Sequence, residues 1–201
     1  MKKLLFTLMS AIVLTVILSV SVFAASTYMV VNGDSLWKIA VRYQVGLSEI
    51  KSVNPQIKNY DLIYPGQIIN LPLKDQTADA YEKEVVHLVN KERAQRGLNE
   101  LTYDWQLSRV ARYKSQDMSD NNYFSHTSPI YGSPFEMMKS FGINYRSAGE
   151  NIAKGQQTPE AVVNAWMNSS GHRANILNKS FTKIGVGYVA NGKYWTQMFI
   201  S

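Results

Sequence analysis

Residues 184–200 read IGVGYVANGKYWTQMFI, and this stretch decides the fold of the larger part of the chain. In residues 184–188 large apolar residues alternate with glycines, which is the period of a strand with one buried face. Asn191-Gly192 is a two-residue turn signal, after which residues 194–200 predict a returning strand. We therefore expect an antiparallel β-hairpin at the C-terminus.

Four amphipathic segments precede this hairpin and predict helices that cover it. In residues 81–89 apolar side chains share one helical face, and His87 lies on the opposite, solvated face. Asp104 is a capping residue for a second helix. Ser133 and Thr158 each precede a proline and predict the starts of a third and a fourth helix. Helices packed on a short sheet indicate an α+β, layered architecture.

The segment before these helices predicts a second, smaller unit. Residues 28–31 are typical of a short strand, and Asp34 or Ser35 can cap a helix that follows. A second short helix begins near Ser48 and ends near Asn54, because Pro55 disfavours helical geometry in the residue before it. A closing strand at 68–71 completes the order strand, helix, helix, strand.

Three strings in this unit, YMVVNGDSLWKIAVRY (28–43), NPQI (54–57) and DLIYPGQIINLP (61–72), resemble a LysM domain over its whole length. The resemblance implies a βααβ module that binds peptidoglycan or another N-acetylglucosamine-containing glycan in a groove between two loops. Exposed backbone in Gly- and Pro-rich turns suits such a ligand. Some apolar residues of the second loop could instead belong to the small core. The implied groove residues are Gly33, Asp34, Ser35, Leu36, Asn59, Tyr60, Asp61, Leu62, Ile63 and Tyr64.

Composition limits the classes of function. The chain has 201 residues, 45% of them hydrophobic, so it can bury a real core. The net charge of +6 falls to +4 without Lys2 and Lys3, which favours anionic wall polymers and does not amount to a nucleic-acid-binding stripe. The absence of cysteine excludes disulfides, thiol nucleophiles and lipid acylation at cysteine.

The N-terminus has the pattern of an export signal. Lys2 and Lys3 precede an apolar run from 4 to 22, and the sequence ahead of Ala24 fits a cleavage site. We expect cleavage after Ala24, with an uncleaved membrane anchor as the alternative, because the run is nearly long enough to span a bilayer. The predicted division is a signal peptide at 1–24, the LysM module at 27–73, a linker at 74–79 and the main domain at 80–201.

The main domain also resembles a known family. Six strings occur in its order: VNKERAQRGL (89–98), YFSHTSP (123–129), AGENIA (148–153), AWMNSSGHRANIL (165–177), IGVGY (184–188) and YWTQMF (194–199). They are similar to the bacterial branch of the CAP superfamily, which also holds cysteine-rich secretory, antigen-five and pathogenesis-related proteins. The resemblance implies an α-β-α sandwich with a central cleft. It implies no single chemistry, because members of one fold carry different functions.

The cleft of that family presents two histidines and two glutamates. By position, His126 matches the first histidine and Glu150 the first glutamate. The second glutamate falls on Ser169 and the second histidine on Tyr194, so the two-histidine metal site does not carry over directly. We hypothesise that His172 supplies the missing imidazole.

These residues leave two interpretations open. His126 and His172 could hold zinc while Glu150 activates water, as in a metal-dependent hydrolase. Alternatively, the three form a hydrogen-bonded cluster that only holds loops in place. Glu136 is a poor second carboxylate for a glycosidase, because it stands at the third helical position of a capping box. Ser169 lacks the surroundings of a nucleophilic serine, and we expect it to end a helix ahead of a C-cap at Gly171.

The sequence therefore predicts an extracellular, cell-wall-associated monomer of an α+β class. It has a LysM module that binds peptidoglycan, and a CAP domain with a cleft at His126, Glu150 and His172. We expect no nucleic-acid partner and no stable membrane association after signal cleavage. A metal-dependent envelope hydrolase and a spore coat or cortex assembly protein are the alternatives.

Overall fold

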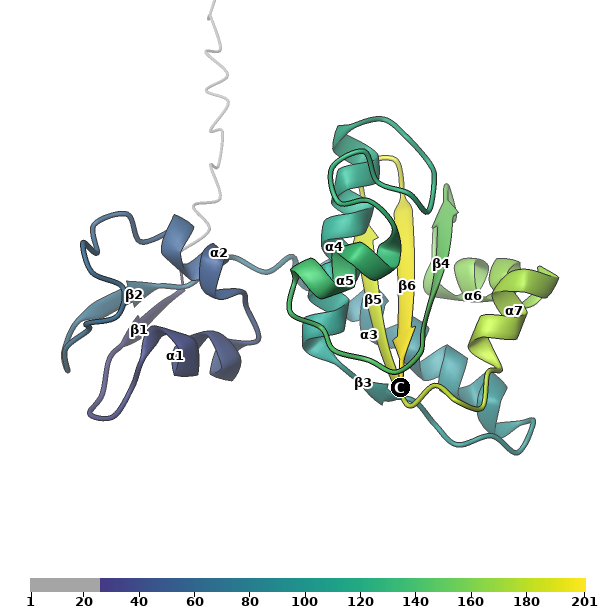
Figure 1. Ribbon diagram of the computed structural model, residues 1–201, viewed down its shortest axis with the longest axis horizontal. Coiled ribbons are helices and arrows are strands. Elements are labelled where there is room, and N and C mark those ends of the chain that lie inside the picture. The colour runs from purple at the N-terminus through teal and green to yellow at the C-terminus, as the bar shows by residue number, and fades with distance from the viewer. Residues whose placement is uncertain (1–25) are drawn as a thin grey trace, which may run out of the picture.

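The computed structural model describes residues 26–201, which form two domains joined by a short segment (Figure 1). The predicted export signal and its cleavage after Ala24 lie outside the described residues. Within the described part, none of the helices has the length and apolar character needed to cross a membrane.

The N-terminal domain has the predicted order of elements. Strands β1 (Thr27–Met29) and β2 (Ile68–Asn70) pair antiparallel, and α1 (Leu36–Tyr43) and α2 (Leu47–Ser52) pack on one face of the pair. Both strands are shorter than the predicted ranges. Ile39, Ile50 and Ile69 are fully buried between helices and strands, so this unit has its own apolar core.

Asn54 joins the end of α2 to β2. Its side-chain amide donates to the carbonyls of Ile50 and Asn70 at 2.8 and 2.7 Å, and its oxygen accepts from the Asn70 backbone N–H at 2.8 Å. The side chain is fully buried, and each of these bonds replaces one that water would make. This residue therefore holds the small domain closed.

Helix α3 (Gln76–Ala94) begins inside the segment predicted as a linker. Asp75 caps it by accepting from the backbone N–H groups of Thr77 and Ala78 at 2.9 and 3.0 Å. The polar character of 74–79 concealed a helix start, since capping residues and linker residues are of the same types.

The C-terminal domain is built on a sheet of four strands in the order β3-β5-β6-β4. The predicted hairpin is confirmed: β5 (Lys183–Val189) and β6 (Tyr194–Ile200) pair antiparallel, with Gly192 at a positive φ in the turn. Strand β4 (Ala148–Lys154) pairs with β6 and forms one edge. The two-residue β3 (Thr102–Tyr103) runs parallel to β5 at the other edge.

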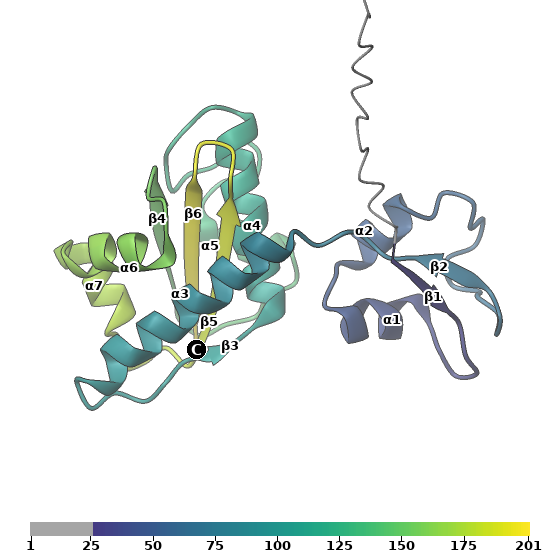
Figure 2. The same ribbon diagram turned by 180° about the vertical axis from the view of Figure 1, so that it is seen from behind.

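Helices cover both faces of this sheet and give the three layers of an α+β fold. Helices α4 (Trp105–Asp120) and α5 (Pro134–Ser140) lie in front of β5 and β6 in Figure 1. Helix α3 crosses the opposite face, with α6 (Pro159–Met167) and α7 (Ser170–Ile176) beside β4 (Figure 2). Trp195 and Phe199 pack toward α3 and α6, and Met198 packs toward α4 and α5.

Glycines let α4 approach the sheet closely. A Cβ on Gly185 would lie 2.3 Å from the backbone nitrogen of Ser108, and one on Gly187 would lie 2.1 Å from that of Arg112. The small residues that alternate along β5 are therefore required by backbone contact.

The expectation of a C-cap at Gly171 was wrong. Helix α6 ends at Met167 with Asn168 as its C-cap, and Ser169 is the N-cap of a further helix, α7. Gly171 lies inside α7 and does not adopt a positive φ. Only Asn168 and Ser169 separate α6 from α7. Ser169 is the N-cap of α7, and Ser170 is its first residue.

Candidate functional site

Glu150 lies on the edge strand β4, opposite Met198 of β6. Its side chain is only 2% exposed, and Oε1 is 2.7 Å from Nδ1 of His126. The other oxygen, Oε2, is buried and has no partner within residues 26–201. Burial raises the pKa of Glu150, although the His126 hydrogen bond and the charge of Lys114 oppose this shift. A carboxylate held in this way is costly to the fold.

His126 lies on the loop that follows α4, and its side chain is about half exposed at 52%. Its backbone carbonyl accepts from Nζ of Lys114 at 2.9 Å. Lys114 is fully buried on α4 and also donates to the hydroxyl of Tyr123 at 3.0 Å. Burial lowers the pKa of Lys114, and the negative charges of Glu150 and Asp117 oppose this shift. Lys114 thus holds the loop that carries His126, and its positive charge interacts with the carboxylate of Glu150.

Asp117 fixes the same loop from further along α4. It accepts from the hydroxyl of Tyr123, from Ser128 Oγ at 2.6 Å and from Asn121 Nδ2 at 2.8 Å. These bonds use both carboxylate oxygens, in contrast to Glu150. The loop that carries His126 is therefore held by polar groups that all have hydrogen-bond partners. The group without a partner in the described residues is Oε2 of Glu150, the residue that binds the His126 imidazole.

His172 lies on α7. Burial lowers the pKa of His172, and the charge of His126 adds to this effect. The backbone carbonyl of His172 accepts from Asn151 Nδ2 at 3.1 Å, and the same amide nitrogen donates to Gln197 Oε1 at 3.0 Å. Nε2 of Gln197 is buried and has no partner in the described part of the chain.

The two positions that depart from the family pattern do not restore it. Ser169 is the N-cap of α7 but makes no capping hydrogen bond through its side chain. Tyr194 is 3% exposed and packs with Met118 and Ile152. It lies four residue pairs from Glu150 along the β4–β6 register, which is roughly 13 Å at the usual strand rise.

The donor set bears on the zinc hypothesis. Among residues 26–201, no group of three or more His, Cys, Asp or Glu side chains is placed to hold a metal ion. His126 and His172 provide two ligands, and a catalytic zinc site has three from the protein. The described donors therefore do not fit a catalytic zinc site, and zinc binding by His126 and His172 stays a prediction.

The arrangement that is present suits recognition of a polar ligand. Glu150 orients the imidazole through Nδ1, which leaves Nε2 of the half-exposed ring free to donate or accept. In the described part of the chain no hydroxyl is hydrogen-bonded to His126. Glu136 completes the predicted capping box with Ser133 on α5.

The first predicted glycan loop is partly used by the fold itself. The Asp34 side chain is 3% exposed and accepts from Tyr28 Oη at 2.6 Å and Arg42 Nη2 at 3.1 Å. The Tyr28 hydrogen bond in particular lowers the pKa of Asp34. Leu36 is buried in the core, whereas Gly33 has a φ of 85° and open space where a side chain would lie. Ser35 is exposed and caps α1.

The second predicted loop divides in the same way. Tyr60 and Ile63 pack against the apolar core, and Tyr60 Oη donates to backbone carbonyls of Lys51 and Asn54 at 3.2 and 3.3 Å. Leu62 and Tyr64 are 51% and 60% exposed. Asn59 and Asp61 are exposed as well. The surface available to a glycan is therefore smaller than the ten predicted residues.

Three residues near these sites did not enter the sequence predictions. Lys114 lies on the same helical stripe as Leu107, Ala111 and Met118, at spacings of three and four. A lysine on a buried stripe is a signal for a charged group inside the domain, and Asp117 on the same helix gives the same signal. Trp37, which follows the first glycan loop, is 62% exposed.

Comparison with known proteins agrees with both domains. The chain matches the CAP family, described as the cysteine-rich secretory protein family, over residues 86–199. It matches the LysM domain over residues 28–72. The two matches occur in the predicted order.

Three similar proteins give context. The protein YkwD of Bacillus subtilis (strain 168), described as uncharacterized, is 67% identical over 124 residues, which are 62% of this chain and 48% of that protein. The spore coat assembly protein ExsA of Bacillus cereus is 47% identical over 47 residues, 23% of this chain and 7% of ExsA. A crystal structure of an extracellular, SCP-domain protein from Bacillus anthracis str. Ames has a TM-score of 0.61 and 38% identity, over 68% of this chain and 47% of that one. The chain thus spans at most about half the length of these relatives.

Proposed function

The chain belongs to the cysteine-rich secretory protein (CAP) family, and from this premise we propose that it is an extracellular protein held at the cell wall by its LysM domain. In this proposal the LysM domain binds N-acetylglucosamine-containing glycan of peptidoglycan. The CAP domain presents His126 and Glu150 as a recognition cleft for a polar ligand.

The observation that carries the wall-binding part is the exposure of the two LysM loops. Gly33, Leu62 and Tyr64 lie open to solvent on loops that the family resemblance assigns to the glycan. The backbone bond from Gly66 N–H to the Val30 carbonyl, at 2.8 Å, brings the second loop next to the start of the first. Open backbone and two exposed apolar side chains are suitable for the acetamide and the apolar face of a sugar.

The recognition role proposed for His126 and Glu150 is supported by two unsatisfied groups near them. Glu150 Oε2 and Gln197 Nε2 are buried without partners in the described residues. Such groups mark places where a ligand or water completes the hydrogen bonding.

A sedimentation experiment with purified peptidoglycan tests the wall-binding part. Chain 26–201 should pellet with the polymer, and Tyr64→Ala and Gly33→Tyr should reduce the pelleted fraction. Gly97→Tyr is the matched control, because Gly97 also has a positive φ and open space but lies in the CAP domain. Ile130→Ala is the control for loss of an exposed apolar side chain. Equal pelleting of the parent and all four variants would contradict LysM-mediated binding.

A second candidate, assembly of the spore envelope, is favoured by the similarity to ExsA. That similarity covers only 47 residues and so concerns one segment of this chain. A fluorescent fusion followed through growth and sporulation separates the two: label on the vegetative wall supports the first proposal, and label confined to the forespore supports the second.

A further inference from the structure

A pocket of about 360 Å³ lies between the two domains, away from both sites described above. The LysM domain contributes Val45 and Glu49 to its lining, and the connecting segment contributes residues 72–75. The CAP domain contributes α4 and the turn after β5, including Ala190. This volume is within the range of small-ligand sites in proteins.

Three basic side chains line the pocket: Lys74, Arg109 and Arg112. Arg109 binds Glu49 and Ser48, and the other two have more unused hydrogen-bond donors. Arg112 donates from Nε to Glu82 Oε2 at 2.8 Å, and Glu82 is fully buried. The remaining N–H groups of Arg112 have no partner among residues 26–201. Lys74 Nζ has none in the same described part. Partial burial lowers the pKa of Lys74, an effect that Asp79 opposes and Arg112 reinforces.

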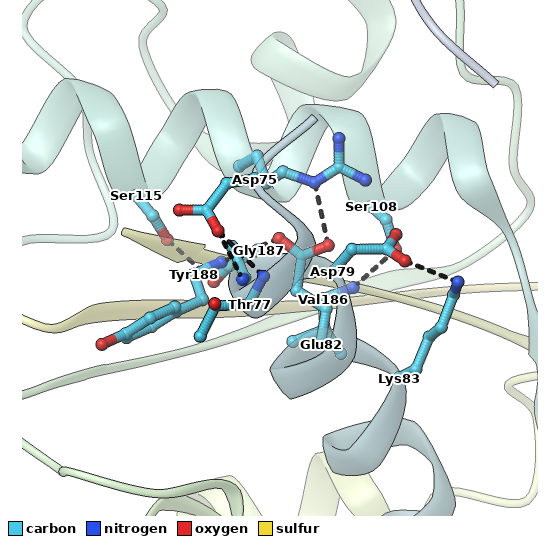
Figure 3. Close-up of polar contacts among 12 residues, drawn as sticks. Asp75, Thr77, Asp79, Glu82, Lys83, Ser108, Ser115, Val186, Gly187 and Tyr188 are labelled. Carbon is cyan, nitrogen blue, oxygen red and sulfur yellow. Dashed lines mark hydrogen bonds and ion pairs between the residues drawn. The ribbon is translucent and has the colours of Figure 1, made fainter. Parts of the chain in front are cut away.

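Glu82 fixes the position of Arg112 on the side away from the pocket. Glu82 accepts the Tyr188 backbone N–H at 3.1 Å through Oε1 and Arg112 through Oε2. Figure 3 shows Glu82 of α3 beside Tyr188 of β5. Because Arg112 binds Glu82 through Nε, its two terminal nitrogens stay free of partners among the described residues. In a planar guanidinium these two nitrogens can together bind the two oxygens of a carboxylate.

The same pocket has three acidic groups, Glu49, Asp75 and Asp79, which oppose a polyanion. Both oxygens of Glu49 are occupied, by Arg109 and the Gly46 N–H. Asp75 uses Oδ1 for the two backbone N–H groups that it caps, which leaves Oδ2 available. Asp79 also lines the pocket and binds Lys83 through Oδ2 at 2.6 Å. A ligand that carries a carboxylate and an ammonium group would satisfy both kinds of charge, whereas a chain of phosphates would face Asp75 and Asp79.

From this pairing of charges we propose that the interdomain pocket binds a short zwitterionic peptide, namely the stem peptide of peptidoglycan. The carboxylate of the peptide lies at Arg112 and Lys74, and its free amino group lies at Asp75. Leu73 and Tyr188 provide apolar walls for its aliphatic parts. The choice of the stem peptide among zwitterionic peptides rests on the proposed function, in which the LysM domain holds the chain on the same polymer.

Calorimetric titration of chain 26–201 with a synthetic, sugar-free stem tetrapeptide containing diaminopimelate tests the proposal. Lys74→Ala should weaken binding by about fivefold, because one partly solvated charge-assisted bond is lost. Ala190→Trp should abolish binding by filling the pocket from an exposed turn position. The matched controls are Lys179→Ala and Ala94→Trp, both at exposed positions outside the pocket, and both should bind as the parent does.

Two further titrations separate this proposal from the proposed function. A tetramer of N-acetylglucosamine reports on the LysM loops and should bind the Ala190→Trp variant as it binds the parent. If the sugar binds and the tetrapeptide does not, or if Ala190→Trp binds the tetrapeptide normally, the pocket proposal is overturned and wall binding stands. If the tetrapeptide binds in the stated pattern and the sugar does not, the pocket assignment is supported and LysM-mediated binding fails. Preferential binding of glycerol phosphate over the tetrapeptide also overturns the pocket proposal.

Discussion

At the scale of single residues, two buried carboxylates of the CAP domain differ in how they are satisfied. Asp117 accepts from Tyr123, Ser128 and Asn121, whereas Glu150 has one partner, His126, and a second oxygen without any within the described residues. An unsatisfied buried group lowers stability, and functional sites hold such groups at that cost.

The first prediction compares these two carboxylates. Glu150→Gln should leave the melting temperature unchanged or raise it, because the cost of burying an ionised group disappears. Asp117→Asn should lower the free energy of unfolding by about 1–3 kcal/mol, because a buried amide cannot accept all three donors. Thermal unfolding of both variants at pH 7 is the measurement. A fall in the Glu150→Gln melting temperature as large as that of Asp117→Asn would show that the His126–Glu150 pair is structural.

The second prediction concerns the pH dependence of Glu82. Burial raises the pKa of Glu82 to about 7 from an ordinary value of 4.5, against the opposing effect of Arg112. The folded protein therefore binds this proton more tightly than the unfolded chain does. The stabilisation that results is complete below about pH 4.5 and is lost as the pH rises through about 7, with a change of up to about 3 kcal/mol.

Chemical unfolding of the parent and of Glu82→Gln at pH 5 and pH 8 measures this change. Glutamine does not titrate, so the difference in unfolding free energy, parent minus variant, isolates Glu82. We expect that difference to favour the parent more at pH 5 than at pH 8. A difference that is constant, or larger at pH 8, would rule out the raised pKa.

At this scale sequence reasoning singled out two residues that lie in contact, and their role as a site stays a prediction. The motif strings located His126 and Glu150, and their contact at 2.7 Å is present. Arg93 shows why other residues were missed: it is 1% exposed and donates to the carbonyls of Asn99, Ile176 and Asn178. Two of those acceptors are more than 80 positions away, so nothing local distinguishes it from the surface residue Arg96.

At the scale of elements, local signals predicted the starts of α4, α5 and α6 but missed those of α3 and α7. Asp104, Ser133 and Thr158 each cap a helix with a side-chain oxygen, as their sequence contexts indicated. Capping is decided within four residues and can be read from the sequence. The break between α6 and α7 was misread because glycine also occurs inside helices.

The third prediction tests the packing of α4 on β5. Gly187→Ala should lower the free energy of unfolding by about 1–3 kcal/mol or more, because the new Cβ would lie 2.2 Å from the backbone carbon of Ala111, which cannot move alone. Gly171→Ala is the matched control: this glycine is inside α7, and a methyl group added to it would have open space for 4 Å around it. Alanine there should stabilise by up to about 1 kcal/mol.

Urea unfolding of the two variants measures both changes in the free energy of unfolding, which should be a decrease for Gly187→Ala and an increase for Gly171→Ala. Destabilisation by Gly171→Ala would mean that Gly171 ends a helix after all. A neutral Gly187→Ala would mean that α4 and β5 are not in backbone contact.

At the scale of the whole molecule, the two domains meet at a charged cluster. Arg109 of α4 donates from Nε to Glu49 Oε1 at 2.5 Å and from Nη2 to Ser48 Oγ at 3.0 Å. The other oxygen of Glu49 accepts from the Gly46 backbone N–H at 2.8 Å and so completes the start of α2. The motifs predicted two modules in order, but a contact between residues 60 positions apart leaves no pattern in either motif.

The last prediction is that Gly46→Ala frees the two domains from each other. Gly46 has ordinary β-region dihedral angles, so alanine fits its backbone, but the new Cβ would lie 2.3 Å from Arg109 Nε. The arginine side chain is flexible and must leave, which breaks its bonds to Glu49 and Ser48. Small-angle scattering should then give a larger radius of gyration, and NMR relaxation should give separate tumbling times for the two domains. Arg109→Ala should reproduce both effects, and Gly171→Ala should show neither.

Unchanged scattering and a single tumbling time in Gly46→Ala and Arg109→Ala would mean that the connecting segment, not this cluster, sets the arrangement of the two domains. In that case tetrapeptide binding in the pocket should also survive Gly46→Ala, whereas loosened domains should lose it.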